Sequence, residues 1–247
     1  MTIVSETDTA RGRQCDTASS LSVVVPVWRD AAALERLLSA HQPSSDQWVV
    51  AGTDNDPDEP ALRRLEASFP GAHWVRGDQG RGPQQNAGAA IATGAWLLFL
   101  HADSTLPVGW RAELARVAAA GRHVWGCFRL GVDADVWQAR LVEWCVARRV
   151  QWWSLPYGDQ GIFVRRDVFQ SVGAFPPYHL MEDVALVGRL ARVGSPFRSR
   201  LAVRTSARRW QEDGWARRSL RNLSVLARYA VGVPPERLVR PYDPSQG

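Results

Sequence analysis

The clearest chemical feature of the sequence is an aspartate that directly follows an apolar run. Residues 97–100 read Leu-Leu-Phe-Leu, and His101, Ala102 and Asp103 come next. A buried strand that ends in a carboxylate holds an oxygen ligand in a fixed position, which suits a hard divalent cation that bridges diphosphate oxygens. Asp103 is therefore the predicted metal ligand. His101 either adds a second ligand, since imidazole tolerates manganese or zinc better than magnesium, or orients a neighbouring carboxylate.

A second acidic motif, Glu182-Asp183, opens a predicted helix. A carboxylate near a helix N-terminus is commonly a cap, and Asp103 could likewise cap the helix expected after Pro107. The functional interpretation is that Asp183 takes the proton of an acceptor hydroxyl as a general base. Both interpretations stay open at this point.

Polar residues also follow the other predicted strands, where ligands bind in open parallel sheets. They are Arg29 and Asp30, then Thr53, Asp54, Asn55 and Asp56, then Gly77, Asp78, Gly80 and Arg81. In the loop over 80–88, backbone amides and Arg81 could meet a phosphate. The loop lacks the Lys-Ser/Thr ending of a nucleoside-triphosphatase loop and the spacing of a dinucleotide fingerprint.

The elements that must position these residues alternate along the chain. Apolar runs predict strands over 21–27, 48–52, 73–76, 96–100, 161–165 and 197–203, and 123–132 alternates like an edge strand. Helical periodicity predicts helices over 31–40, 61–68, 85–93, 110–120, 134–153, 167–172, 181–193 and 215–231. This alternation predicts an α/β fold with a single doubly wound, mostly parallel sheet flanked by helices.

Composition narrows the partners. The 247 residues include 30 basic side chains, all of them arginine, and carry a net charge of +5, which suggests nucleotides, nucleic acid or anionic lipid headgroups. Nucleic acid is the weaker expectation, because the arginines are dispersed and no nucleic-acid-binding motif appears. Cys15, Cys127 and Cys145 have no disulfide or zinc spacing. Residues 1–20 read as a disordered leader, and no apolar run approaches the roughly 18 residues of a spanning helix, so we expect a cytoplasmic protein.

Twelve tryptophans are many for this length. Trp137, Trp144, Trp152 and Trp153 share one predicted helix with arginines, and basic residues recur beside apolar ones over 215–226. Such segments could lie at the inner face of a membrane and bring a lipid-linked acceptor to the site. The alternative is that these tryptophans pack in the core.

In their order and spacing, these segments resemble glycosyltransferase family 2 from residue 21 to about 242, closest to the small bacterial branch often labelled radical-SAM/selenodomain-associated transferases. The resemblance is carried by residues 23–26 (Val-Val-Val-Pro), 81–103, 156–161 (Pro-Tyr-Gly-Asp-Gln-Gly), 181–183 (Met-Glu-Asp) and 205–210 (Thr-Ser-Ala-Arg-Arg-Trp). It implies a GT-A fold, a uridine- or guanosine-diphosphate sugar donor, a divalent cation (Mn²⁺ or Mg²⁺), transfer of a hexosyl or similar group, and inversion at the anomeric carbon.

The resemblance also assigns roles. Asp103 corresponds to the metal-binding aspartate of the D-x-D motif, with His101 in place of its first acid, and Asp183 matches the catalytic base. The Arg-Arg-Trp run at 208–210 resembles the end of a Gln-x-x-Arg-Trp motif, with Ser206 in the place of the glutamine. Where the family has a base-reading carboxylate after strand two, this chain has Ala51-Gly52, and Asp54 or Asp56 could substitute.

Together these inferences define a predicted site. The catalytic residue is Asp183; the donor residues are Pro26, Asp30, Asp54, Arg81, Asn86, Ala102 and Asp103; the acceptor and sugar residues are Asp159, Gln160, Glu182, Arg208 and Trp210; the metal ligands are Asp103 and His101. The predicted transferase domain spans 21–242, with a nucleotide-binding half (21–104), an acceptor and catalytic half (105–210) and a C-terminal helical segment (211–242).

Two other functions remain as alternatives. One is a non-catalytic or weakly active nucleotide-sugar-binding protein, which the residues at 51 and 101 make plausible. The other is a sugar nucleotidyltransferase. A nucleotidyltransferase would carry a glycine-rich loop with a basic residue after strand one, and residues 26–30 (Pro-Val-Trp-Arg-Asp) do not resemble such a loop.

Overall fold

The computed structural model describes residues 20–41, 46–178 and 180–239. Residues 1–19 of the predicted leader and residues 240–242 of the predicted C-terminal segment lie outside these ranges. None of the helices in the described ranges is both long enough and apolar enough to cross a membrane.

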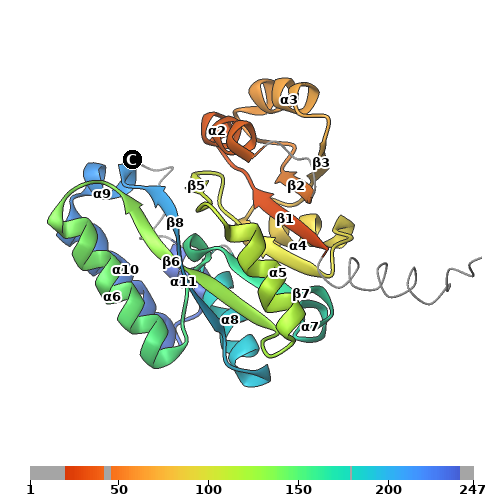
Figure 1. Ribbon diagram of the computed structural model, residues 1–247. Helices are drawn as coiled ribbons and strands as arrows, with labels where there is room; N and C mark the ends of the chain where they lie inside the picture. Colours follow the sequence, from red (N-terminus) through yellow and green to blue (C-terminus); the bar gives the residue numbers. More distant parts are fainter. Residues whose placement is uncertain (1–19, 42–45, 179, 240–247) are drawn as a thin grey trace, which may run out of the picture.

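The first half of the chain forms the parallel part of the sheet (Figure 1). Its strands are β1 (Leu21–Pro26), β2 (Gln47–Gly52), β3 (Ala72–Arg76) and β4 (Trp96–Phe99), which pair in parallel in the order β3-β2-β1-β4. The helices between them are α2 (Ala31–His41), α3 (Glu59–Ser68) and α4 (Arg81–Ile91). The predicted elements are confirmed, although α3 begins at Glu59 rather than 61 and α4 at Arg81 rather than 85. Gly80, at φ 127, leads into the helix, and the first turn of a helix tolerates Pro83.

The second half extends the same sheet with mixed directions. The strands β7 (Ile162–Arg165), β6 (Trp125–Asp133), β8 (Phe197–Ser206) and β5 (Ser104–Thr105) complete the eight-stranded order β3-β2-β1-β4-β7-β6-β8-β5. β7 is antiparallel to both β4 and β6, whereas β6 and β8 are parallel. The predicted edge position of 123–132 is wrong, because β6 lies between β7 and β8 and buries most of its residues.

Helices cover both faces of the sheet, as doubly wound folds require (Figure 1). The helices of this half are α5 (Trp110–Ala120), α6 (Trp137–Trp153), α7 (Arg166–Ser171), α8 (Glu182–Val193), α9 (Arg208–Asp213), α10 (Trp215–Ala230) and α11 (Pro235–Val239), with a 3-10 turn η1 (Gly158–Gln160). Alternate residues of β1 face the two layers: Val23 and Val25 pack in the cluster of α2, α3 and α5, and Val24 packs in the cluster of α4, α7 and α8. The single, mostly parallel sheet flanked by helices is thus confirmed.

A third, smaller cluster joins α6 to the far end of β6. Leu130 and Val132 of the strand bury against Ala139 of α6, with Val142 and Val146 packed around them. The start of α10 reaches the same cluster through Trp215. The two long helices of the second half therefore meet beside β6.

Candidate active site

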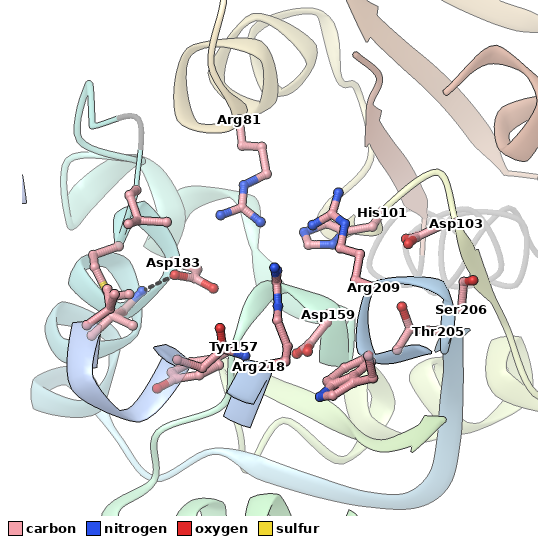
Figure 2. Close-up of a pocket in the computed structure, with 16 residues that line it drawn as sticks. Arg81, His101, Asp103, Tyr157, Asp159, Asp183, Thr205, Ser206, Arg209 and Arg218 are labelled. Atoms are coloured by element: carbon pink, nitrogen blue, oxygen red, sulfur yellow. Dashed lines mark hydrogen bonds between the residues drawn. The ribbon is translucent and has the colours of Figure 1, made fainter. Parts of the chain in front are cut away.

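A pocket opens beyond the carboxyl end of β4, where the sequence places His101 and Asp103 (Figure 2). Its empty volume is about 830 Å³, a figure that includes the open space at its mouth. The lining residues are Arg81, His101, Asp103, Tyr157, Asp159, Leu180, Met181, Asp183, Val184, Thr205, Ser206, Arg209, Trp210, Arg218, Asn222 and Val225.

Asp103 is positioned by the two-residue strand β5. In the antiparallel β5–β8 pair, Ser104 lies opposite Thr205, so the end of β4 is held against the end of β8. Asp103 therefore sits beside Thr205 and Ser206 at one side of the pocket (Figure 2). The alternative role as a helix cap is excluded, because α5 starts after Gly109 and has no side-chain cap.

Asp183 stands across the pocket, in the first turn of α8. One carboxylate oxygen accepts the N–H of Gly158 at 2.7 Å, and the other accepts the N–H of Val184 at 2.7 Å, which Figure 2 draws as a dashed line. Met181, the residue before Glu182, has a backbone φ of 67. Residues other than glycine adopt this left-handed conformation at a cost in free energy. Asp183 thus serves the start of the helix and also faces the pocket, with lone pairs left for a further proton or ligand.

His101 also lines the pocket, on the side of Asp103 and Arg209 (Figure 2). Burial, with a contribution from Arg81, lowers the pKa of His101 to about 3. A β-carbon on Gly158 would stand 2.9 Å from Nε2 of His101 and 3.4 Å from Oδ2 of Asp183. The glycine therefore leaves room for the imidazole and the carboxylate to approach the same turn.

Three guanidinium groups, from Arg81, Arg209 and Arg218, point into the pocket (Figure 2). Nε of Arg81 is 2.9 Å from the buried carboxylate of Glu182, and Arg218 pairs with Asp213 at 2.9 Å. Planar guanidinium groups bind phosphate oxygens in bidentate fashion. The pocket therefore presents donors of the kind that bind phosphate oxygens, next to three carboxylates.

Asp159 is the third carboxylate of the pocket. Burial raises its pKa to about 6, although Arg149 opposes this shift, and its Oδ1 is buried without a hydrogen-bond partner. Next to it, the guanidinium of Arg149 lies 3.4 Å from the ring centroid of Tyr157 and donates to the carbonyl of Leu155. The loop that carries Asp159 is thus anchored to α6.

Within the described ranges, no group of three or more His, Cys, Asp or Glu side chains is arranged to hold a metal ion. Magnesium is commonly bound by one or two carboxylates together with substrate phosphates rather than by an all-protein cage. Asp103, half-buried at the pocket wall, and the unpartnered oxygen of Asp159 fit that mode of binding.

The structure places several predicted site residues outside the lining of this pocket. Glu182 lies behind Arg81 and is 1% exposed; burial raises its pKa to about 7, against the effect of Arg81. Gln160 is buried and donates its amide to the carbonyl of Phe128 while accepting the N–H of Tyr157.

Four others serve neighbouring structure. Asp30 pairs with Arg208 at 3.6 Å across the loop after β1, and burial raises the pKa of Asp30. Pro26 and Ala102 are buried at the ends of β1 and β4. These residues shape the surroundings of the pocket from behind.

Asp54 and Asn86 line a separate hollow beside β3, together with Arg76, Gly77, Asp78, Pro83, Ala87, Phe175 and Pro177. The amide of Asn86 both donates to the carbonyl and accepts the N–H of Phe175. Asp56, the other candidate substitute for the carboxylate after strand two, is buried and accepts the N–H groups of Arg29 and Asp58.

Other residues of the pocket had no role in the sequence-based prediction. Arg218, Asn222 and Val225 come from α10, and Arg209 follows the predicted Arg208. The spacing 218, 222 and 225 is i, i+4 and i+7, which places the three side chains on one face of a helix. That periodicity was the available signal, but only the tertiary structure shows that this face closes the pocket.

The family can now be assigned. The model of "Glycosyl transferase family 2" matches residues 22–174, more than half of the chain. The chain belongs to glycosyl transferase family 2. Among curated proteins, none matches the chain.

Solved structures agree on the fold of this family 2 member. Residues 1–349 of S. aureus TarS superpose with a TM-score of 0.59 at 13% identity, covering 76% of this chain and 60% of that one. The same TarS fragment in complex with UDP-GlcNAc gives a TM-score of 0.58 at 12% identity, covering 76% and 58%. A mycobacterial protein gives 0.54 at 17% identity, covering 78% and 67%. The predicted GT-A fold is confirmed, and the chain spans about 60% of the TarS fragment.

Proposed function

We propose that this family 2 glycosyltransferase moves a sugar from a nucleotide-diphosphate sugar to an acceptor hydroxyl, with inversion at the anomeric carbon. The observation that carries the proposal is the placement of Asp103 and Asp183 on opposite sides of one pocket, with the guanidinium groups of Arg81 and Arg209 in the same pocket. The UDP-GlcNAc complex of the structurally similar TarS fragment supports the donor class.

In the proposed reaction, Asp183 accepts the proton of the acceptor hydroxyl as that oxygen bonds to the anomeric carbon. The bond between this carbon and the diphosphate oxygen breaks on the opposite face, which inverts the configuration. The hydrogen bonds from Gly158 and Val184 hold the carboxylate in one orientation, so that little reorganisation is needed.

The leaving diphosphate is stabilised from the other side. Arg81, held by Glu182 at 2.9 Å, and Arg209 offset the charge that develops on the phosphate oxygens. A divalent cation, manganese or magnesium, held by Asp103 and the phosphates would supply further positive charge to the leaving group. His101, neutral at physiological pH, is a second possible ligand beside them.

The test combines donor binding with turnover. A panel of UDP- and GDP-sugars, with and without manganese, should raise the thermal transition for the cognate donor only, because a ligand of the native state stabilises it. Asp183→Asn should lower kcat by about 10²- to 10⁴-fold with donor binding retained. Asp103→Asn should remove the manganese dependence of the donor shift. The control is Asp135→Asn, an exposed carboxylate before α6. Unchanged turnover in Asp183→Asn would exclude this residue as the base.

A nucleotide-sugar-binding protein with little or no turnover is the second candidate. It is favoured by His101 in the position of the first acid and by the use of Asp56 to hold backbone amides rather than a ligand. A donor that shifts the thermal transition but is neither hydrolysed nor transferred, with any acceptor tried, would support this candidate over the transferase.

A further inference from the structure

Large apolar side chains are exposed together along α6 and α10. They are Trp137 (71% exposed), Leu141 (50%), Trp144 (55%), Trp152 (64%), Trp153 (69%), Leu220 (66%), Leu223 (61%) and Val231, just past α10 (80%). We call this surface the α6/α10 face. The expectation that these tryptophans could pack in the core is wrong, because α6 already packs on β6 through Ala139 and its neighbours.

Trp137 and Trp144 of α6 lie in a stripe opposite its packed side. Trp137, Leu141 and Trp144 recur at i, i+4 and i+7, so they lie in one row along the helix. The helix is therefore apolar on both sides, one against the sheet and one exposed. A soluble helix normally exposes a polar side, so this pattern points to a partner for the outer row.

Arginine accompanies the exposed apolar residues. The guanidinium of Arg148 lies 5.5 Å from the ring centroid of Trp144, and Arg217 and Arg228 are exposed on α10. A shallow groove on α10 is lined by Arg217, Leu220, Arg221 and Ser224. The sequence of α10 contains four arginines and no acid. Exposed tryptophan, leucine and arginine are the composition of helices that rest on anionic lipid.

Charge also argues against a second copy of the chain on this face. A two-fold interface would place the same patch against itself, and arginine would then meet arginine. The one acid within α6, Glu143, is already paired with Arg140 at 2.9 Å. Asp135 and Glu212 lie just before the two helices rather than between the exposed apolar residues.

The same helices form part of the pocket. Arg218, Asn222 and Val225 line it from the inner side of α10, and Arg149 of α6 stacks on the pocket residue Tyr157. Figure 1 shows α6 and α10 at the same end of the molecule, beside β6 and β8, and Trp215 joins them in one cluster. A surface in contact with the outer sides of these helices would therefore lie next to the pocket.

We propose that the α6/α10 face docks on an anionic lipid surface and thereby brings the pocket to acceptors held at that surface. The docking itself needs no donor and no turnover; only the delivery of an acceptor rests on the proposed transferase function. The expected acceptor is accordingly a lipid-linked hydroxyl compound that enters along α10.

The test measures co-sedimentation with phosphatidylcholine vesicles, with and without phosphatidylglycerol, at low and high salt. We expect binding to the anionic vesicles only, with a marked loss at high salt. Trp152→Ser/Trp153→Ser, Leu220→Gln/Leu223→Gln and Arg217→Gln/Arg228→Gln should each weaken binding roughly tenfold or more. All six positions are exposed, so the fold should persist, which circular dichroism checks.

Matched controls come from exposed residues elsewhere. Val108→Gln/Val193→Gln removes apolar side chains that are 99% and 51% exposed, and Arg122→Gln/Arg192→Gln removes two exposed arginines; neither should change vesicle binding. Equal binding to both vesicle types, no binding at all, or variants that bind like the unchanged protein would each overturn the proposal.

Sedimentation velocity tests whether a second copy of the chain, rather than lipid, covers the α6/α10 face. If the chain is a dimer that the Leu220→Gln/Leu223→Gln variant dissociates, and vesicles are not bound, a second copy covers the face and the proposal fails. Failure of docking would leave donor binding and transfer intact. Conversely, a chain without transfer activity could still bind vesicles, so the two proposals are tested separately.

Discussion

Gly158 shows how closely single residues are fitted at the site. The backbone φ of Gly158 is not positive, so backbone conformation does not require a glycine here. The neighbouring atoms require it, because they leave no room for a side chain. Its α-carbon faces His101 and Asp183, and its N–H donates to the Asp183 carboxylate. Any side chain here would press on the imidazole and the proposed base together.

We predict that Gly158→Ala lowers kcat at least tenfold and destabilises the fold by about 1–3 kcal/mol, the usual range for overpacking. The methyl group would lie 2.9 Å from Nε2 of His101, closer than carbon and nitrogen normally approach. The matched control is Gly188→Ala in α8, where nothing lies within 4 Å of the new β-carbon, and helix propensity favours alanine. Steady-state kinetics measures the change in kcat, and urea unfolding measures the change in stability. A Gly158→Ala protein with normal turnover would show that the turn shifts to accommodate the methyl group.

Sequence reasoning found the acidic residues of the site more readily than its arginines. Asp103 could be predicted because it ends an apolar run, and Asp183 because it opens a helix. Arg218 looked like any surface arginine of an amphipathic helix, yet it is 7% exposed and lines the pocket. Whether such a side chain points inward depends on which elements pack beside its helix, and local spacing does not contain that information.

Between elements, Asn86 fastens α4 to the segment before α8. Its side-chain amide satisfies both the N–H and the carbonyl of Phe175, at 3.0 and 2.8 Å. This contact, together with the Arg81–Glu182 pair, fixes the start of α4 near the start of α8. The helices that carry Arg81 and Asp183 are therefore positioned relative to each other by these contacts.

We predict that Asn86→Ala lowers the free energy of unfolding by about 1–3 kcal/mol, because it leaves two backbone groups of Phe175 without partners. The donor-induced thermal shift should be retained. The control is Asn55→Ala in the exposed loop after β2. Urea unfolding measures the structural role of Asn86, and the donor-induced thermal shift measures a role in donor binding. Unchanged stability with lost donor binding would favour the sequence-based assignment of Asn86 to the donor.

Most elements could be predicted from periodicity, and the exceptions have physical causes. In β6, Gly126, Arg129 and Gly131 interrupt the apolar run, so the sequence lacks the continuous apolar pattern of a central strand. A β-carbon on Gly126 would stand 2.5 Å from the carbonyl of Phe197, so crowding by the next strand requires the glycine. The two residues of β5 are too few to form a pattern, although their pairing with β8 places Asp103.

For the molecule as a whole, two buried acids affect stability. Burial raises the pKa of Asp159 to about 6 and that of Glu182 to about 7, above their ordinary values of 3.8 and 4.5. The native state therefore holds these protons at pH values where the unfolded chain has released them. Their stabilising contribution is complete below pH 3.8 and 4.5, and is lost as the pH rises through about 6 and 7.

We predict that Asp159→Asn gains stability relative to the unchanged protein between pH 4 and pH 7, by on the order of 1 kcal/mol. The neutral amide has no charge to desolvate, so this part of the pH dependence disappears. Urea unfolding at several pH values measures the difference, with the exposed Asp135→Asn as the control. A constant difference between Asp159→Asn and the unchanged protein would mean that Asp159 does not titrate in this interval.

At the scale of the whole molecule, only some properties could be predicted from the sequence. The apolar runs and their order were enough to predict an α/β fold with a mostly parallel sheet, because parallel strands covered on both faces need them. The GT-A fold was implied by the resemblance to glycosyltransferase family 2. The branch within the family, the division at 104 and 210, the leader over 1–20 and the cytoplasmic location stay predictions. The structure of the chain by itself does not test these predictions.

The short strand β5 has a further consequence for behaviour at high concentration. Because it covers only Arg204 and Thr205 of the ten-residue β8, the rest of that strand edge has no strand beside it among the described residues. Bare edges invite strands of other molecules and lead to aggregation, which charged side chains discourage. Arg198, Arg200 and Arg204 are exposed along β8. Charged side chains at these positions would oppose the pairing of this edge with a strand of another molecule.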